Sequence, residues 1–254
     1  MKEIILMWEL LFVSIVCFGQ HYNSSSIFAH NDYLKPQPLT AAYSKQVGFI
    51  EADVFLVGDN LLVAHTRVEI QKRKTLEALY LAPLAKLATA NDGFIYSNQE
   101  KTLTLMIDLK TDGEKTLPVL VEMLKKFPSL ITCKNFRVAV SGNMPPPSTW
   151  NTYPDFIHFD GRPTILYTPD QLARLRLISD SFGNYSSWNG KGELNAADQA
   201  KLAAVVKLSH GKNKLIRFWG APDNQLAWKK LIELNIDVIN TDHVAEVLDR
   251  KSVV

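Results

Sequence analysis

The chain has 254 residues, of which 46% are hydrophobic, and its formal net charge is +2 at pH 7. This length and composition suit one large α/β domain or two small ones, each with a substantial buried core. A nearly balanced charge provides no strong field for a nucleic acid or a membrane surface, so we expect no nucleic-acid partner.

The first 20 residues have the pattern of a cleaved secretion signal. An apolar run from Ile4 to Phe18 is followed by the small residue Gly19 and then by a polar segment. A run of this length with these flanks fits a signal peptide better than a membrane anchor. We therefore expect a secreted or periplasmic protein whose mature part is residues 21–254.

The two cysteines bear on the same question. Lipid attachment at Cys17 is the less favoured alternative, because Val16 stands where such sites require a small residue. If Cys17 leaves with the signal, Cys133 has no partner for an intramolecular disulfide, and the exported protein must depend on its core for stability.

Short apolar runs alternate with helical patterns through the rest of the chain. The expected strands are Ile27–His30, Phe49–Leu56, Leu61–His65, Leu103–Lys110, Phe136–Val140, Phe156–Asp160, Leu175–Ser179, Leu215–Trp219 and Val238–Asn240. The expected helices are Leu76–Ala90, Glu114–Lys126, Pro169–Arg174, Ala196–His210 and Asn224–Leu234. The run Leu61–His65 follows its neighbour after the tight turn Gly58–Asn60, so we expect a hairpin within a loop rather than a separate barrel strand.

The eight remaining strands, alternating with helices, predict a single-domain (β/α)₈ TIM barrel. A doubly wound open sheet is the alternative, but no glycine-rich phosphate-binding turn follows the first strand.

Two carboxylates lie on one face of the expected strand Phe49–Leu56. Side chains two apart on a strand point the same way, so Glu51 and Asp53 project together, while the opposite face is wholly apolar. Burying such a pair is costly unless a cation or hydrogen-bond donors satisfy it. With Asp108 near the end of another strand, three oxygen ligands favour a hard cation, Mg²⁺ or Ca²⁺, over zinc. An acidic pair on a solvated strand edge is the plain structural alternative.

Two histidines flank these carboxylates. His30 ends the first expected strand, and His65 ends the hairpin run behind the acidic pair. In a TIM barrel the catalytic groups lie at the C-terminal ends of the strands. Histidine titrates near neutrality, so one imidazole can act as a general base while the other acts as a general acid. Either residue alone would more often be a satisfied buried histidine.

Further polar side chains near strand ends are candidates for contacts with a substrate. Lys110 shares a face with Asp108 and is expected either to pair with it or to hold an anionic oxygen. Arg217 and Trp219 share the face of a later strand, where Trp219 is expected to form a wall of the pocket. Another strand carries three polar residues at alternate positions, which are His158, Asp160 and Arg162. An internal salt bridge would account for that set equally well.

Taken in chain order, these residues resemble the superfamily of phospholipase C-like phosphodiesterases with a TIM barrel. That superfamily includes the glycerophosphodiester phosphodiesterases and the sphingomyelinase D enzymes. The ordered set HNDY, EADV, LLVAH and INTD is most similar to a branch that includes bacterial exported proteins and the eukaryotic "altered inheritance of mitochondria" proteins. The resemblance covers nearly the whole chain after the signal segment.

The resemblance implies a role for each matching residue. The ligands of one divalent cation would be Glu51, Asp53 and Asp108. The general base and general acid would be His30 and His65. The substrate contacts would be Lys110, Arg217, Trp219 and Asn31.

The chain also departs from the pattern of the family. Glycerophosphodiesterases usually carry an arginine directly after the first histidine, where this chain has Asn31. The phosphate contact that such an arginine supplies would have to come from Lys110, Arg162 or Arg217. Asp108 stands where a glutamate is usual, which is closer to the sphingomyelinase D pattern.

We therefore expect an exported, divalent-metal-dependent phosphoric diester hydrolase that acts on a glycerophosphodiester or a phospholipid head group. We expect it to act as a monomer that contacts a membrane surface transiently, and loop aromatics such as Tyr185 and Trp188 would either touch lipid or pack within their loop. Two alternatives remain. One is a non-catalytic barrel that binds a phosphate or a lipid, and the other is a metal-independent glycosidase that uses Glu51 and Asp108 as its carboxylate pair.

Overall fold

The computed structural model describes residues 22–249. The expected signal segment, with Cys17 and the proposed cleavage site, lies outside the described residues. Within the described range, none of the helices combines the length and the apolar character needed to cross a membrane.

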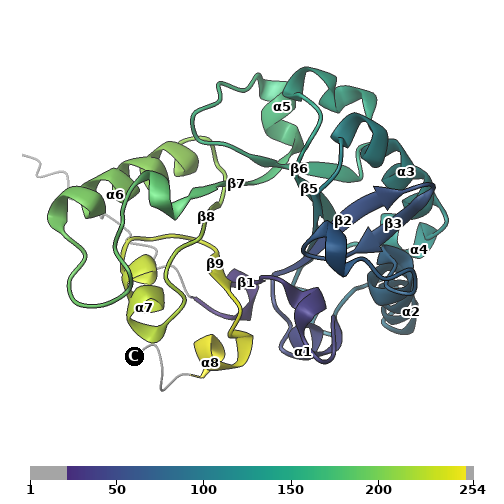
Figure 1. The fold of residues 1–254 in the computed structure, drawn as a ribbon, viewed down its shortest axis with the longest axis horizontal. Helices are drawn as coiled ribbons and strands as arrows, with labels where there is room; N and C mark the ends of the chain where they lie inside the picture. The colour runs from purple at the N-terminus through teal and green to yellow at the C-terminus, as the bar shows by residue number, and fades with distance from the viewer. Residues whose placement is uncertain (1–21, 250–254) are drawn as a thin grey trace, which may run out of the picture.

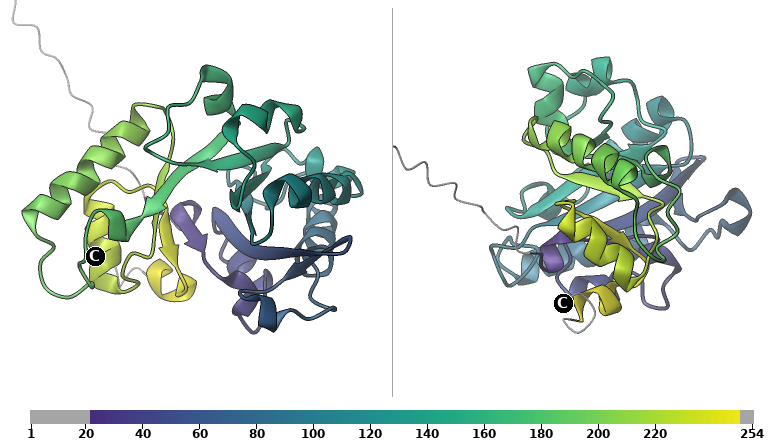
Figure 2. Two further views of the ribbon diagram at one scale, coloured as in Figure 1. Left: turned by 45° about the horizontal axis from the view of Figure 1, so that its top comes forward. Right: turned by 90° about the vertical axis from the view of Figure 1, so that its left-hand side faces the viewer.

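Eight parallel strands form a nearly closed barrel, and the helices lie around its outside (Figures 1 and 2). The strands are β1 (Ile27–Ala29), β2 (Phe49–Val57), β4 (Leu103–Leu109), β5 (Phe136–Gly142), β6 (Ile157–Gly161), β7 (Leu175–Ser181), β8 (Ile216–Trp219) and β9 (Ile239–Thr241). Their order around the barrel is β8-β7-β6-β5-β4-β2-β1-β9. A single parallel bridge between Arg217 and Val238 joins the two ends of this order. The predicted TIM barrel is confirmed.

The remaining strand, β3 (Asn60–Val63), pairs antiparallel with β2. Gly58 has a φ of 59° in the tight turn between them, a conformation that glycine adopts without a side-chain clash. The predicted hairpin is thus confirmed, and it carries the chain back along β2 to Asp53, whose carbonyl oxygen accepts the backbone N–H of Ala64.

All five predicted helices are present, with ends shifted by at most one residue except in the first. That helix begins as a π-helical turn, Glu77–Leu81, which continues into α2. The α-helices are α1 (Thr40–Ser44), α2 (Ala82–Ala90), α3 (Gly113–Lys125), α4 (Pro128–Ile131), α5 (Pro169–Arg174), α6 (Ala196–His210), α7 (Gln225–Glu233) and α8 (Val244–Leu248). Short 3₁₀ turns are Ser24–Ser26, Asp32–Leu34, Arg67–Glu69, Pro147–Thr152 and Phe182–Asn184. The sequence did not predict α1, α4 and α8, because helices of four or five residues are too short to show a helical period.

The apolar core has two parts. A large cluster fills the space between the strands and the helices, and a small one fills the inside of the barrel. The inner cluster consists of Phe28, Phe49, Met106, Ala139, Leu177 and Val238. Phe28 and Phe49 stack with their ring centroids 5.9 Å apart. Because this cluster occupies the middle of the barrel, the polar groups above it and below it lie in separate spaces.

Candidate active site

The C-terminal ends of the barrel strands surround a cavity of about 300 Å³. All the residues that the sequence suggested as catalytic groups, metal ligands or substrate contacts line this cavity, except His158. Two further residues complete the lining, which are Ser141 and Gly142. The structure therefore brings the predicted site residues together.

A left-handed residue at the end of β1 positions the first histidine. Asn31 has a φ of 48°, a conformation that asparagine tolerates better than most residues. Its backbone N–H donates to Glu51 Oε2 over 3.1 Å, and its side-chain Nδ2 lies 3.0 Å from His30 Nδ1. His30 Nε2 lies 3.6 Å from the same Glu51 oxygen. The turn thus holds His30 through Nδ1 and directs Nε2 toward the carboxylates.

A buried hydroxyl connects the two histidines. Tyr33 Oη lies 2.7 Å from Asp53 Oδ2, 2.8 Å from Asn31 Oδ1 and 3.1 Å from His65 Nδ1. Burial, followed by the charge of Asp53, raises the pKa of Tyr33, so its hydroxyl remains a donor. Donation to Asp53 leaves the tyrosine oxygen to accept from His65 Nδ1–H. His65 Nε2 then remains available for proton transfer.

Asp32 fixes the loop that carries these groups. Its Oδ2 atom accepts the backbone N–H of Leu39 over 2.6 Å and the hydroxyl of Tyr80 over 2.8 Å. Asp32 is 1% exposed, and burial raises its pKa despite these donors. Each residue of the HNDY motif thus has a separate structural role, and Asp32 serves as an anchor rather than as part of the cavity wall.

An ammonium group joins two of the three carboxylates. Asp53 on β2 and Asp108 on β4 are register partners in the sheet. Lys110 Nζ lies 2.9 Å from Asp53 Oδ2 and 2.7 Å from Asp108 Oδ2. Burial lowers the pKa of Lys110, but the two carboxylates more than offset this, so the pKa is raised and the side chain stays charged. Ser141 Oγ donates to the other oxygen of Asp108 over 2.7 Å.

Glu51 is a buried carboxylate with an exposed fraction of 7%. Burial raises its pKa, and the nearby His30 and Arg217 partly oppose this rise. Its contacts with Asn31 and His30 both fall on Oε2. A buried carboxylate with few donors gains stability from a nearby cation.

The donor chemistry of Glu51, Asp53 and Asp108 fits a hard divalent cation. Their arrangement is not that of a preassembled metal centre: between residues 22 and 249, no three His, Cys, Asp or Glu side chains are grouped closely enough to hold a metal ion. Lys110 supplies the positive charge between two of the carboxylates instead. A divalent cation would therefore have to compete with this ammonium for Asp53.

Two guanidinium groups share one carboxylate on the opposite wall. Asp160 Oδ2 lies 3.0 Å from Arg162 Nη1 and 3.5 Å from Arg217 Nη2, and its Oδ1 accepts from Ser179 Oγ over 2.6 Å. The Arg162 guanidinium also lies 4.9 Å from the ring centroid of Trp219. Because this wall has one carboxylate and two guanidinium groups, its net charge is positive. A positive wall suits the binding of an anionic phosphoryl group.

The grouping of His158 with Asp160 and Arg162 is wrong in one respect. Asp160 and Arg162 form the expected salt bridge, but His158 lies at the other end of the barrel, in a different cavity. The alternation of side chains along a strand predicts which face of the sheet a side chain is on. It does not predict the position of that side chain along the barrel axis. Residues two apart on one face differ in height by about 7 Å.

Residues 18–136 match the family model described as AIM6-like phosphodiesterase domain. An altered inheritance of mitochondria protein 6 homolog from Arthroderma benhamiae is 26% identical over 259 residues, which cover 86% of this chain and 81% of that protein. Altered inheritance of mitochondria protein 6 from Eremothecium gossypii is 26% identical over 271 residues, which cover 87% of this chain and 68% of that protein.

This chain resembles the AIM6 branch of the phospholipase C-like phosphodiesterases. The resemblance inferred from the ordered motifs is therefore confirmed. The crystal structure of a glycerophosphodiester phosphodiesterase from Parabacteroides distasonis superposes with a TM-score of 0.55 and 15% identity, covering 89% of this chain and 96% of that chain. At this identity the likeness shows a shared TIM-barrel fold.

Tyr33 and Ser141 contact the predicted site residues, and neither was predicted from the sequence. Tyr33 reaches the site because the left-handed Asn31 turns the chain back over β2, and no periodic pattern predicts such a turn. The sequence feature that could have indicated a role for Tyr33 is its position in the HNDY motif, three residues after His30. Ser141 follows an apolar strand, and its contact with Asp108 depends on the register of β4 and β5.

Proposed function

We propose that this protein is a divalent-metal-dependent phosphodiesterase that hydrolyses a glycerophosphodiester or a phospholipid head group. The family model that matches residues 18–136 is that of a phosphodiesterase domain, which supports the reaction class. The proposed metal dependence, substrate class and acid–base pair rest on the chemistry of the cavity.

One observation carries the proposal. His30 and His65 are both held through Nδ1 by a single chain of contacts that runs from Asn31 through the Tyr33 hydroxyl. This arrangement fixes two imidazoles relative to each other and leaves both Nε2 atoms for proton transfer. A structural histidine needs one partner, whereas a pair oriented by a common buried hydroxyl suits paired acid–base chemistry.

The charged walls of the cavity suit a phosphodiester. Lys110 on one side and the Arg162–Arg217 pair on the other provide cations for the phosphoryl oxygens, on which negative charge increases in the transition state. One histidine accepts the proton of the attacking hydroxyl, and the other donates a proton to the oxygen that leaves. A divalent cation held by Glu51, Asp53 and Asp108 would withdraw further charge from the phosphoryl group.

The test is turnover of bis(p-nitrophenyl) phosphate by the purified protein with Mg²⁺, with Ca²⁺ and with a chelator. We expect the chelator, His30→Ala and Asp53→Ala each to abolish most of the activity. His243→Ala is the matched control, because this histidine lies on the surface at the start of α8 and its side chain contacts Glu246 rather than a residue of the cavity. Activity that is indifferent to the chelator would refute metal dependence. Phosphodiester binding without turnover under any condition would favour a non-catalytic barrel.

We also propose that the protein is exported and that it acts on its substrate outside the cytoplasm. The apolar run from Ile4 to Phe18 supports this proposal. N-terminal sequencing of the mature protein tests it, and we expect a new terminus close to residue 21. A product that retains residues 1–20 in the cytoplasmic fraction would refute export.

A further inference from the structure

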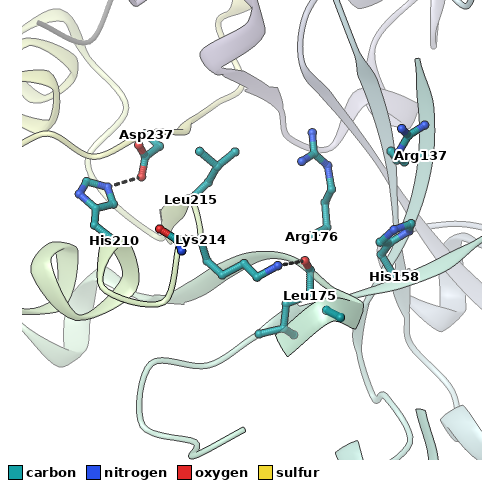
Figure 3. Close-up of a pocket in the computed structure, with 10 residues that line it drawn as sticks. Arg137, His158, Leu175, Arg176, His210, Lys214, Leu215 and Asp237 are labelled. Carbon is teal, nitrogen blue, oxygen red and sulfur yellow. Dashed lines mark hydrogen bonds and ion pairs between the residues drawn. The ribbon is translucent and has the colours of Figure 1, made fainter. Parts of the chain in front are cut away.

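A second cavity, of about 500 Å³, opens at the opposite end of the barrel (Figure 3). Its walls come from the first residues of β5, β6 and β7 and from the segments that precede β8 and β9. The inner apolar cluster with the Phe28–Phe49 stack separates it from the candidate active site. Its basic side chains are Arg137, His158, Arg176, His210 and Lys214.

Three of these cations have no carboxylate partner among residues 22–249. Arg137 Nη1 donates to the carbonyl oxygen of Phe136 over 2.7 Å, and Lys214 Nζ donates to the carbonyl oxygen of Leu175 over 2.8 Å. Arg176 Nε donates to the hydroxyl of Thr104 over 2.8 Å. These acceptors are neutral, so they leave the positive charges uncompensated.

Among the described residues the cavity has one carboxylate, and that carboxylate is already engaged. Asp237 Oδ2 lies 2.8 Å from His210 Nε2 and also accepts the backbone N–H of Ile216 over 2.8 Å. Asp237 therefore balances His210 and holds the start of β8. The rest of the cavity keeps an excess of positive charge.

Arg176 is the group best placed to receive an anion. Its guanidinium lies 5.3 Å from the ring centroid of Phe49, and its Nε is fixed by Thr104. Neither terminal nitrogen donates to a residue in the part of the chain that the structure describes. In Figure 3 the side chain lies between Lys214 on one side and Arg137 with His158 on the other. A guanidinium fixed at Nε presents its two terminal N–H groups as a fork that fits two oxygens of one anion.

The cations also affect one another. Burial, followed by the charge of Arg137, lowers the pKa of Arg176. Burial, followed by the charge of Arg176, lowers the pKa of Lys214. Partly buried like charges in one cavity destabilise each other, and an anion bound between them would offset that cost.

We propose that this cavity at the N-terminal end of the barrel binds a phosphate dianion, held by the fork of Arg176 together with Arg137 and Lys214. The dianion is either free inorganic phosphate or the phosphate of a small monoester, for which the volume leaves room. This site is separate from the phosphodiester site and does not depend on the proposed function.

The test is isothermal titration of the purified protein with inorganic phosphate and with glycerol phosphate at constant ionic strength. We expect the variant R137Q/K214Q to lose at least about tenfold in affinity, because two of the three uncompensated cations are removed. The matched control is K207Q/K229Q, which removes the same charge from exposed positions on α6 and α7 and should bind as the parent does. Tighter binding of glycerol phosphate than of phosphate identifies a monoester, and tighter binding of phosphate identifies free phosphate.

Two further measurements keep the result interpretable. R137Q/K214Q should retain the parent's circular dichroism and its turnover of bis(p-nitrophenyl) phosphate, because neither residue lies at the candidate active site. If that variant does not fold, Arg176→Lys retains the charge but lacks the fork, and we expect it to bind phosphate more weakly than the parent. Equal phosphate affinity in the parent and the folded variants would overturn the proposal, as would the absence of binding of either probe to the parent.

Discussion

Lys110 Nζ lies 2.9 Å from Asp53 Oδ2, between two of the three carboxylates that we propose as metal ligands. The ammonium and a divalent cation therefore compete for one oxygen. We expect Lys110→Met to raise the affinity for Mg²⁺ or Ca²⁺ by about tenfold or more, because one removed charge near the site changes the electrostatic energy by at least about 1.4 kcal/mol. The same variant should turn over more slowly, because the phosphate loses a cation.

The metal affinity is measured by the rise in melting temperature across a titration of each cation. Asp53→Asn serves as the reference that should lose the metal-dependent rise. An unchanged or weaker metal affinity in Lys110→Met would contradict the competition.

Tyr33→Phe tests the hydroxyl that orients both histidines. We expect kcat to fall by about tenfold or more. General acid–base catalysis accelerates a reaction by about 10²–10⁴-fold, and a misdirected pair of histidines loses part of that acceleration. We also expect the free energy of unfolding to fall by about 1–3 kcal/mol, since buried Asp53 loses a donor. Tyr43→Phe is the control: its hydroxyl donates to the carbonyl of Ile95 over 2.7 Å, away from the cavity. Equal losses of kcat in both variants would show that Tyr33 has only a structural role.

The rates of variants at the two histidines should depend differently on the leaving group of the substrate. His30→Asn and His65→Asn should each lower kcat by about 10²–10⁴ on an alkyl phosphodiester, where the leaving oxygen needs a proton. On a p-nitrophenyl ester His65→Asn, which lacks the proposed general acid, should recover most of its rate, because p-nitrophenolate leaves without protonation, whereas His30→Asn should stay slow. Steady-state kinetics on the two substrates therefore identifies the acid. Recovery in both variants, or in neither, would contradict a division into one acid and one base.

Asp32→Asn tests the buried anchor of the HNDY loop. Burial raises the pKa of Asp32 above its usual value near 3.8, so the folded chain binds this proton more tightly than the unfolded chain. The free energy of unfolding therefore loses a contribution as the pH rises from 3.8 through the folded-state pKa. Asparagine keeps an oxygen for both donors and carries no charge. We expect the variant to melt at a higher temperature than the parent at pH 7, with the difference disappearing below about pH 3.8.

Melting curves of both proteins between pH 3 and pH 8 measure this difference. A variant that is less stable than the parent at pH 7 would show that the charge of Asp32 stabilises the loop.

Two exposed side chains near the active-site entrance bear on membrane contact. Val68 is 93% exposed on the loop after His65, and Leu166 is 94% exposed on the loop after Arg162. The aromatic residues considered from the sequence, Tyr185 and Trp188, pack against the core instead. We expect Val68→Ser/Leu166→Ser to weaken sedimentation with phospholipid vesicles and to leave turnover of bis(p-nitrophenyl) phosphate unchanged.

Serine at Val57 and Leu208 is the matched control for this measurement, because both are exposed apolar residues away from the cavity. Equal vesicle binding by the parent and both double variants would refute contact through these loops.

The barrel and most of the candidate site were predictable because they depend on short-range rules. Alternation placed Glu51 and Asp53 on the inner face of β2, and the rule for barrel enzymes placed them near His30 and His65. Height along the barrel depends on the register between strands, so His158 was grouped with the wrong residues. The role of Tyr33 depends on a backbone turn with positive φ, which single-residue propensities do not reveal. The contact of Lys110 with two carboxylates was left open from the sequence, and it became visible only with side-chain positions.

The stacked pair Phe28 and Phe49 has a consequence for the whole barrel. Arg217 lies 4.0 Å from the ring centroid of Phe28 on the active-site side, and Arg176 lies 5.3 Å from that of Phe49 on the other. The two rings are therefore a dielectric spacer between two like charges, and they also block diffusion through the bore. Solutes at the two ends exchange with solvent through different openings. Truncating either ring to alanine would leave a cavity between the two guanidinium groups and weaken this separation.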